Sequence, residues 1–271
     1  MRPTVIGQTL RAIGLVVVVV VMLVPIIWMV ISSLKTNVQI YDASQAFIFS
    51  PTLDNYRAVL GRANFLQYIW NSFLVAALST AISMVLAVPA AYSMSRFTMR
   101  RSAVTVLMAR VIPGVSLLVP WYYVFSNLHM VGGYGVLVLS HMFVALPLIL
   151  YIMMGFFDGL PTDLEEAGQV DGLTALGAFF RVTLPLATPG VATAGILAFI
   201  FSWNNFMFAL VLSGAQTKTL PVAIFDFVGY ASIDWGALMA AASVVTLPIM
   251  LIALFAQRYV VSGLTAGALK G

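Results

Sequence analysis

The side chains that could do chemistry in this 271-residue chain are few, and its acidic ones gather in one segment. Five of the nine carboxylates lie between residues 158 and 171, namely Asp158, Asp163, Glu165, Glu166 and Asp171. Because the segment 158–189 has one cation, Arg181, its net charge is four negative (5 − 1 = 4). It also carries the apolar residues Leu164, Leu173, Leu176, Phe179, Phe180, Val182 and Leu184. This mixture fits either an amphipathic loop beneath a helix bundle or a docking element for a soluble partner, and the paired phenylalanines and the negative charge favour docking.

A second group of polar residues is Trp203-Asn204-Asn205, which lies inside a long apolar run. An indole face can stack on an apolar ring face of a solute, and amides can bond to its hydroxyl groups. The same side chains could instead form hydrogen bonds between helices, which contribute about 0.6 kcal/mol on average in a membrane protein. A substrate path and a structural contact therefore remain as two interpretations of this group.

Several kinds of chemistry are excluded by what the sequence lacks. It has no Cys and two His, His129 and His141, which excludes disulfides, thiolate chemistry and a His-rich metal site. No Gly-x-x-x-x-Gly-Lys-[Ser/Thr] loop is present to hold nucleotide phosphates. The Gly-x-Ser-x-Gly nucleophile of a serine protease is missing, and so are the Ala-Arg pair and further aspartates that a phospholipid head-group transferase would need after Asp171-Gly172. We therefore expect a protein that is not an enzyme.

The composition indicates where these residues are placed. The chain is 62% hydrophobic and 8% charged, whereas an ordinary soluble domain has about 25% charged residues. A membrane-crossing helix needs about 20 apolar residues, and six charge-poor runs predict spans at about 12–34, 71–95, 102–125, 135–157, 190–213 and 236–257. The first run could be a signal peptide, but its 23 uncharged residues are too many and no cleavage site follows. We expect an all-α integral membrane protein with six transmembrane helices in a single domain, 1–271.

The cations in the connections predict the orientation of the chain. With both termini in the cytoplasm, the inner segments hold eight Lys and Arg residues: Arg2, Arg11, Arg96, Arg100, Arg101, Arg181, Arg258 and Lys270. The outer segments hold four: Lys35, Arg57, Arg62 and Lys218. Since short cytoplasmic loops are enriched in Lys and Arg, this bias places both termini, and the segment 158–189, on the cytoplasmic side.

The segment 158–189 has the sequence of two short helices joined by a turn. Thr162 and Glu165 have the spacing of a capping box, and the acidic first turn suits a helix N-terminus. Asp171-Gly172 is a turn signal. Thr174 is expected to cap a second helix that continues to about Val182 and is stopped by Leu184-Pro185.

These residues resemble the signature loop, or EAA motif, of the membrane subunits of binding-protein-dependent ABC importers. The family pattern is Glu-Ala-Ala, three residues, Gly, nine residues and Ile-x-Leu-Pro, and it matches Glu166 to Pro185 with Gly168 for the second Ala and Val182 for Ile. The glycine should loosen the first short helix by about 1 kcal/mol relative to alanine. Further stretches resemble the smaller, maltose-type permease of the carbohydrate branch: Ser33-Leu34-Lys35, Asn55-Tyr56, Asn71-Ser72, Ala91-Tyr92-Ser93, Trp203-Asn204 and the tail 263–271.

The resemblance implies a type I ABC permease fold and a chain that forms half of a sugar-conducting pore. Implied partners are a homologous second permease, two cytoplasmic ATPases and an extracytoplasmic sugar-binding protein. No cofactor is implied in this chain, because ATP and Mg would be bound by the ATPase. The residues that the resemblance assigns to ATPase coupling are Glu165, Glu166, Ala167, Gly168, Asp171, Gly172, Leu184 and Pro185.

A stand-alone secondary transporter or channel for small polar solutes is the alternative function. Such proteins normally have inverted repeats and helices broken at the midplane of the membrane. The sequence suggests neither feature, which favours the importer permease.

The predicted orientation can be tested with reporters fused after Gly271. Because the positive residues favour an inner C-terminus, a reporter that is active in the cytoplasm should work there. A reporter that works only outside the cell should be silent. The opposite pattern would contradict the orientation.

Overall fold

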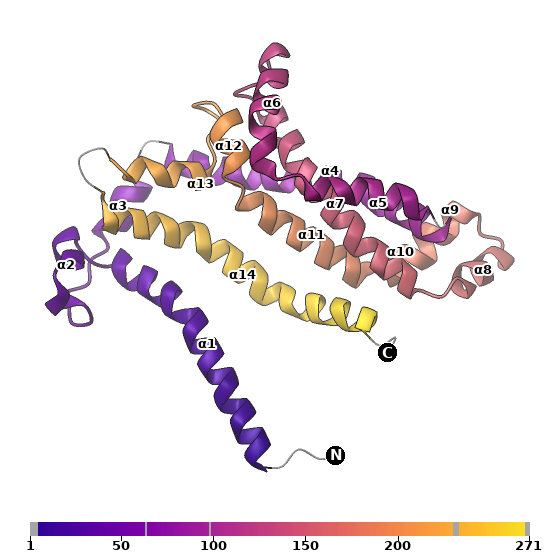
Figure 1. Cartoon of the computed structure of the whole chain (residues 1–271), viewed down its shortest axis with the longest axis horizontal. Helices are drawn as coiled ribbons and strands as arrows, with labels where there is room; N and C mark the ends of the chain where they lie inside the picture. The colour runs from indigo at the N-terminus through magenta and orange to yellow at the C-terminus, as the bar shows by residue number, and fades with distance from the viewer. Residues whose placement is uncertain (1–4, 63, 98, 230–232, 269–271) are drawn as a thin grey trace. The chain divides into compact units, whose positions relative to one another are not determined.

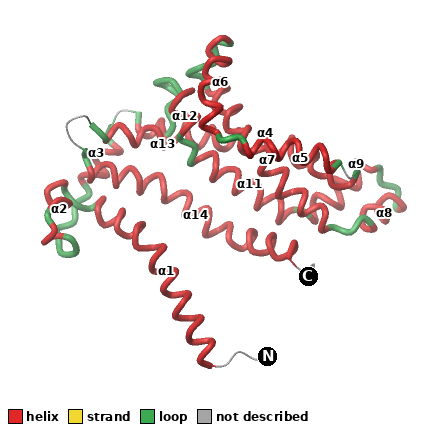
Figure 2. Tube along the Cα trace, in the orientation of Figure 1, coloured by secondary structure: helices red, strands yellow, loops and turns green. Residues whose placement is uncertain are grey.

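The computed structural model describes residues 5–62, 64–97, 99–229 and 233–268. These residues form helices and turns, with no β-strand beyond two isolated bridges (Figure 2). The all-α class expected from the sequence is therefore confirmed. The chain divides into two compact units, one made of residues up to Leu66 together with Ile224–Leu247, and the other of Gln67–Ala223 with the residues from Pro248 onwards.

The first unit contains a long apolar helix and a group of short elements (Figure 1). Its elements are α1 (Val5–Ser33), α2 (Asn37–Tyr41), η1 (Ala43–Gln45), α3 (Asp54–Leu60), η4 (Ile224–Phe227) and the first part of α14 (Trp235–Ala268). The side chains of α1 from Leu15 to Val24 are exposed. A helix that exposes apolar residues on every side is stable in a bilayer and not in water.

Lys35 binds the end of α1 to the segment that follows it in the chain. The side chain is buried, its Nζ donates to the carbonyl oxygen of Ala46 at 2.6 Å, and it lies over the rings of Trp28 and Phe49. Asn55 donates to the carbonyl oxygens of Ser33 and Lys35, both at 2.8 Å. The residues Ser33, Lys35 and Asn55, which carried part of the family resemblance, therefore hold α1 and α3 together.

The second unit contains the remaining helices. The first of them, α4 (Phe65–Arg96), begins two residues before the boundary of the unit at Gln67. The others are α5 (Arg100–Met108), η2 (Ala109–Val111), α6 (Gly114–Asn127), α7 (Tyr134–Gly159), α8 (Asp163–Val170), α9 (Ala175–Ala178), the π-helical turn η3 (Phe179–Thr183), α10 (Leu184–Leu186), α11 (Thr188–Trp203), α12 (Met207–Leu212) and α13 (Leu220–Ala223). The later part of α14 completes the unit.

Four helices of the described residues are long and apolar enough to cross a membrane without interruption. They are Arg11–Ser33, Phe65–Arg96, Tyr134–Gly159 and Trp235–Leu254. Two further pairs pass the same test only together, Arg101–Val111 with Gly114–Asn127 and Ala175–Leu186 with Thr188–Trp203, and they are bent by 92° and 73°. The number of spans is six when each bent pair counts as one.

The two bends correct the expectation that the sequence contains no broken helix, and proline explains both. Ile112 precedes Pro113 and is extended (ψ 120°), because a residue before proline avoids the helical region. At the second bend, Pro189 has no N–H to donate to the carbonyl oxygen of Pro185, and the hydroxyl of Thr188 donates to that oxygen instead at 2.7 Å. The predicted span 102–125 is therefore bent at Pro113.

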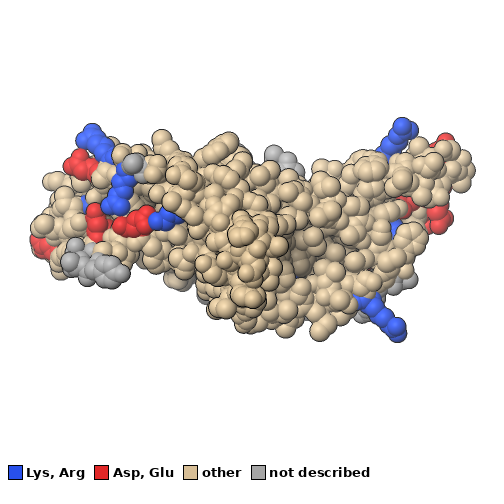
Figure 3. Space-filling model, turned by 90° about the horizontal axis from the view of Figure 1, so that it is seen from above, with Lys and Arg blue, Asp and Glu red and all other residues tan. Residues whose placement is uncertain are grey.

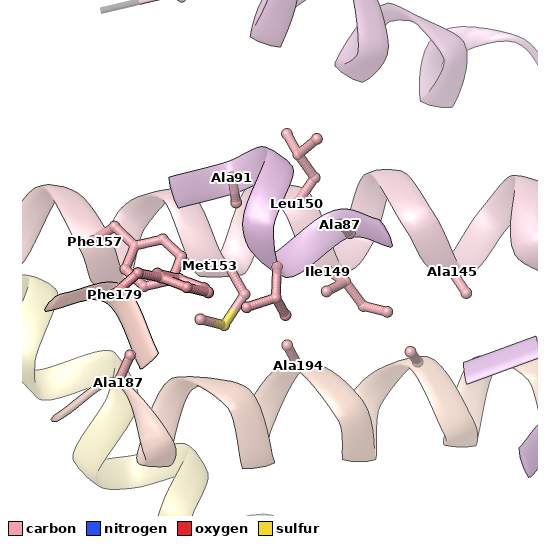
Figure 4. Close-up of a cluster of buried hydrophobic side chains, with 12 residues drawn as sticks. Ala87, Ala91, Ala145, Ile149, Leu150, Met153, Phe157, Phe179, Ala187 and Ala194 are labelled. Carbon is pink, nitrogen blue, oxygen red and sulfur yellow. The ribbon is translucent and has the colours of Figure 1, made fainter. Parts of the chain in front are cut away.

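The core of the second unit lies where α4, α7 and α11 meet. Its members are Ala87, Val88, Ala91, Ala145, Ile149, Leu150, Met153, Phe157, Phe179, Ala187, Ala194 and Ala198. Figure 4 shows Ala194 of α11 pointing toward Ile149 and Met153 of α7, with the rings of Phe157 and Phe179 beside each other. Small residues let helix backbones approach closely, and such packing is one source of helix association in lipid.

Gly190 offers a test of this close packing. A Cβ placed on Gly190 would lie 2.6 Å from Cδ2 of Phe156, whereas a Cβ on Gly155 would meet nothing within 4 Å. Gly190→Ala should therefore destabilise the protein by about 1–3 kcal/mol through overpacking, while Gly155→Ala should not. Thermal unfolding of the two variants in detergent would measure the difference, and adding Phe156→Ala should relieve the clash. Equal unfolding midpoints for Gly190→Ala and Gly155→Ala would contradict the packing described here.

Candidate functional site

The first short helix of the segment 158–189 is α8, and it ends in a defined turn. Gly172 has φ +91°, a conformation that favours glycine. The N–H of Leu173 donates to the carbonyl oxygen of Gly168, and the N–H of Gly172 donates to that of Gln169, both at 3.0 Å. These two bonds form a Schellman motif, which satisfies carbonyl groups at the helix end. The turn expected at Asp171-Gly172 is therefore present.

Gly168 has a packing role that the sequence did not reveal. It is buried, and a Cβ there would lie 3.3 Å from both Leu173 Cδ1 and Val182 Cγ2. The glycine thus allows α8 to lie close against the second half of the segment. The helix stability that this glycine is expected to cost is offset by the packing that the close contact allows.

The prediction of a capping box at Thr162 and Glu165 is wrong. Thr162 has helical backbone angles and makes no side-chain bond to the helix end. The backbone carbonyl oxygen of Thr162 accepts instead from the N–H groups of Glu165 and Glu166. Glu165 does not reach back to the start of its helix, because its carboxylate is bound to another part of the chain.

Glu165 is buried against the end of α4. Its Oε1 lies 2.6 Å from Nη2 of Arg96 and accepts from Nε at 2.8 Å, and its Oε2 accepts from the hydroxyl of Tyr92 at 2.7 Å. The exposed fractions of the Arg96 and Glu165 side chains are 11% and 9%. Burial alone would raise the pKa of Glu165, but the hydrogen bonds from Arg96 and Tyr92 and the charge of Arg96 outweigh it, so the pKa lies below its ordinary value.

Arg96 connects α8 to α7 as well as to α4. Its Nη1 donates to the carbonyl oxygen of Phe157 at 2.9 Å, and Nη2 donates to that of Leu160 at 3.3 Å. Both oxygens lie at the end of α7, where carbonyl groups lack partners within the helix. The ends of α4 and α7 and the first turn of α8 therefore meet at one guanidinium group.

The second half of the segment runs as a continuous helical stretch from α9 through η3 to α10. Thr174 caps it as expected, since its hydroxyl accepts from the N–H of Gly177 at 3.1 Å. The prediction that this helix ends at Leu184-Pro185 is wrong, because the helix continues through Pro185 and bends only at Ala187. The wider π-turn over Phe179–Thr183 lies where the ring of Pro185 would otherwise clash with the carbonyl group of Arg181.

The residues assigned to coupling divide into an exposed group and a supporting group. Glu166, Ala167, Asp171, Gly172 and Pro185 are exposed, whereas Glu165 and Gly168 are buried and Leu184 is half-buried. Large apolar side chains accompany the exposed group, with exposed fractions of 87% for Val170, 72% for Leu176, 61% for Phe180 and 44% for Leu164. Figure 3 shows acidic atoms at the α8 end of the second unit, on the right of the picture, with Lys or Arg atoms nearby.

Among the described residues, no three His, Asp or Glu side chains lie close enough together to hold a metal ion. The segment is thus a surface of exposed apolar groups and carboxylates, supported from behind by Glu165 and Arg96.

Trp203, Asn204 and Asn205 lie at a break between α11 and α12, and not within one continuous helix 190–213. Asn204 is exposed, and its Nδ2 donates to the carbonyl oxygen of Ile200 at 2.9 Å. Oδ1 of Asn205 accepts from the N–H of Phe208 at 3.2 Å, at the start of α12. Trp203 is buried and stacks on Phe199 at 6.0 Å between ring centroids. The two amides therefore complete helix ends, and Asn204 is the exposed residue of the three.

Sequence reasoning missed the two residues that hold Glu165. Arg96 served only as a sign of orientation, and Tyr92 only as part of a matching stretch. The sole available signal was that Ala91-Tyr92-Ser93 matched the importer family immediately before Arg96. Asn71 is similar: it matched the family, and it is buried with its Nδ2 donating to the carbonyl oxygens of Gln216 and Lys218.

The chain is similar to membrane components of import systems. The family model for binding-protein-dependent transport system inner membrane components matches residues 83–266, more than half of the chain. The sulfoquinovosyl glycerol transport system permease protein SmoH of Agrobacterium fabrum is 37% identical over 98% of this chain and 95% of that protein. The trehalose/maltose transport system permease protein MalG of Thermococcus litoralis is 34% identical over the full length of both chains.

A solved structure shares the fold. It is a bacterial ABC transporter involved in the import of the acidic polysaccharide alginate, with a TM-score of 0.79, 19% identity and coverage of 96% of this chain and 98% of that one. Fold and family model together define an integral membrane component of an ABC importer. The chain belongs to the family of binding-protein-dependent transport system inner membrane components. It is a transport subunit and not an enzyme, since ATP hydrolysis in these systems is carried out by a separate subunit.

The role of Arg96 can be measured with a double-mutant cycle. Arg96→Ala leaves a buried carboxylate without a cationic partner and should destabilise the packing of α8 by about 3–5 kcal/mol. Glu165→Gln added to Arg96→Ala should recover part of that loss, because the unpaired charge is removed. Hydrogen exchange of the amides of 163–170 would measure both effects, with Arg101→Ala, at an exposed arginine, as control. Additive effects of the two changes would contradict a direct pair.

Proposed function

We propose that this chain forms half of the translocation pore of an ATP-driven sugar importer and couples the pore to a cytoplasmic ATPase through the segment 158–189. The similarity to permeases named for sulfoquinovosyl glycerol, trehalose and maltose supports a carbohydrate cargo. The membrane is the plasma (inner) membrane of a prokaryote, with both termini in the cytoplasm. Membership of the importer family argues against the stand-alone transporter or channel.

The exposed side of the segment is the observation that carries the coupling proposal. Val170, Leu176 and Phe180 are each more than half exposed, and burying them against a partner removes apolar area from water. Glu166 and Asp171 lie beside them and are also exposed, so a complementary partner presents a groove with apolar walls and cationic side chains. A surface of this kind favours the docking element over the alternative of an amphipathic loop folded beneath the helix bundle of the same chain.

Coupling also requires that the docked surface be fixed to the membrane helices. Glu165 and Gly168 are buried, and Arg96 joins Glu165 to α4 and α7. The helical stretch α9–α10 leads directly into α11 through the bend at Ala187. A movement of the exposed surface is therefore passed to three membrane helices through short connections.

The proposed sugar path includes the break between α11 and α12. A helix break inside an apolar segment presents polar groups that an unbroken helix would keep bonded internally. Asn204 is exposed at this break and can bond to sugar hydroxyls, while its Nδ2 is held by the carbonyl oxygen of Ile200. Polar side chains in a membrane segment usually face a cavity or the bundle interior, which supports a path at this position.

The proposed assembly contains three further kinds of subunit. They are a homologous second permease, two ATPases that bind ATP and Mg, and an extracytoplasmic sugar-binding protein. A related solved structure, with a TM-score of 0.63 and 15% identity, is the alginate ABC transporter in complex with a periplasmic protein bound to an alginate pentasaccharide. The chain described here supplies no cofactor site in this proposal.

Reversing the charge of Glu166 tests the coupling surface. Glu166 is exposed and lies outside the candidate membrane spans, so Glu166→Lys should leave the protein inserted and folded. Loss of a charge contact at an interface commonly costs about 2–5 kcal/mol, which corresponds to roughly 30- to several-thousand-fold in affinity. The ATPase should dissociate or hydrolyse ATP without sugar uptake, as measured by co-purification and uptake into vesicles.

The matched control is Asp54→Lys, which makes the same charge change at an exposed residue of α3. Its pairing with Arg57 is solvent-exposed and contributes little, so transport should persist. Gly172→Val is a poorer test because φ at Gly172 is +91° and any side chain there strains the turn. Wild-type uptake and ATPase binding in Glu166→Lys would refute the coupling role of this surface.

A further inference from the structure

His141 joins three membrane helices through a chain of buried hydrogen bonds. The residue lies on α7 with 2% of its surface exposed. Its Nδ1 is 2.7 Å from Oγ of Ser202 on α11, and Oγ of Ser202 is 2.9 Å from Oγ of Ser79 on α4. Ser79 and Ser202 are buried as well. From the sequence alone, His141 counted only as evidence against a His-rich metal site.

Either oxygen of the Ser79–Ser202 pair can be the donor, and the role of Nδ1 depends on the tautomer of His141. Ser79 Oγ lies 3.2 Å from the carbonyl oxygen of Ala76. When its one hydrogen is donated there, Ser202 donates to Ser79 and Nδ1 of His141 donates to Ser202. In both tautomers Nδ1 is bonded to Ser202, and the buried Nε2 has no hydrogen-bond partner among the described residues.

An unpartnered nitrogen makes His141 a costly residue for packing alone. A buried polar atom without a partner costs stability, and a leucine would fill similar space without that cost. The hydrogen bond from Nδ1 is what a leucine could not supply. The role of His141 therefore depends on which part of the structure Ser202 fixes in place.

Ser202 is the last member of a row of small residues on α11. Gly190, Ala194, Ala198 and Ser202 recur every fourth residue and are all buried, and α11 packs along α7. Phe156 packs against Gly190 at one end of this row, whereas the short side chains of Ala194 and Ala198 reach little between the side chains of α7, so they fix the position of the other end of α11 only weakly. The bond from His141 to Ser202 fixes it at the end next to Asn204.

We propose that His141 is a positioning residue for the sugar path, which holds the end of α11 through Ser202 and thereby sets where Asn204 lies. This proposal rests on the proposed function, in which Asn204 borders the path. His141 itself does not touch the sugar.

The side chains of Asn and Gln separate the role of Nδ1 from that of general packing. The amide nitrogen of Asn can take the place of Nδ1 and bond to Ser202, whereas that of Gln lies near the place of Nε2. In the complete importer, His141→Gln and His141→Leu should lower the sugar moved per ATP hydrolysed by about fivefold, the effect of roughly one net hydrogen bond. His141→Asn should keep the wild-type ratio. Ser202→Ala should act like His141→Gln, with a smaller change in volume.

The ratio of sugar to ATP distinguishes positioning from folding. A variant that only reduces the amount of folded importer lowers uptake and ATP hydrolysis together and leaves the ratio unchanged. An unchanged ratio in both His141→Gln and Ser202→Ala would overturn the proposal. So would a loss in His141→Asn as large as that in His141→Leu, because packing would then be the role of the residue.

Labelling with a thiol reagent tests the position of α11 without reference to sugar. The chain has no cysteine, so Asn204→Cys gives a single site. Its labelling rate in the complete importer should change by a similar factor in the His141→Gln background and be restored in His141→Asn. Leu186→Cys, exposed in α10 at the other end, is the control and should label at a constant rate. A constant rate at both sites would overturn the proposal.

Asn204→Leu separates this proposal from the proposed sugar path. If Asn204→Leu leaves the sugar-to-ATP ratio at the wild-type value, Asn204 does not border the path and that part of the proposed function fails. A labelling rate of Asn204→Cys that changes when His141→Gln is added would still establish that His141 positions the end of α11.

Discussion

The buried carboxylate of Glu165 is the contact on which the presentation of the segment 158–189 depends. A carboxylate in this position is tolerated only with a cation and further donors, and Arg96 and Tyr92 supply them. The same guanidinium binds the carbonyl groups at the end of α7. Because a single charge satisfies all three elements, α8 cannot shift alone without leaving polar groups unpaired. The exposed apolar residues are thereby kept at a fixed place relative to α4 and α7.

The sequence predicted those elements whose causes are local. Apolar runs between charges located long helices, because spanning a bilayer requires length and apolarity alone. Asp171-Gly172 and Thr174 were identified correctly, since a turn with positive φ and a helix cap depend on one or two neighbouring residues. The bend at Pro113 follows from an equally local rule, since the residue before a proline avoids the helical region.

Parts of the site that depend on distant contacts could not be predicted. The pattern at Thr162 and Glu165 is a valid capping signal, but Arg96, 69 residues earlier, offers Glu165 a stronger partner. No pattern in the sequence links these two positions. His141 gave no signal either, because its partners Ser79 and Ser202 come from two other helices. The family resemblance assigned residues of the segment to coupling, but it gave no sign that Arg96 and Tyr92 hold Glu165.

The row of small residues along α11 also bears on the motion that its interface with α7 permits. Packed helices can move past one another by small sliding steps without separating, and the short side chains of Ala194 and Ala198 put little in the way of such sliding. Gly190, whose backbone lies against the ring of Phe156, is at the end of α11 that follows the bend at Ala187. In the proposed coupling, a push on α9–α10 acts at this end of α11, and the contact of Gly190 with Phe156 is the first that it must shift.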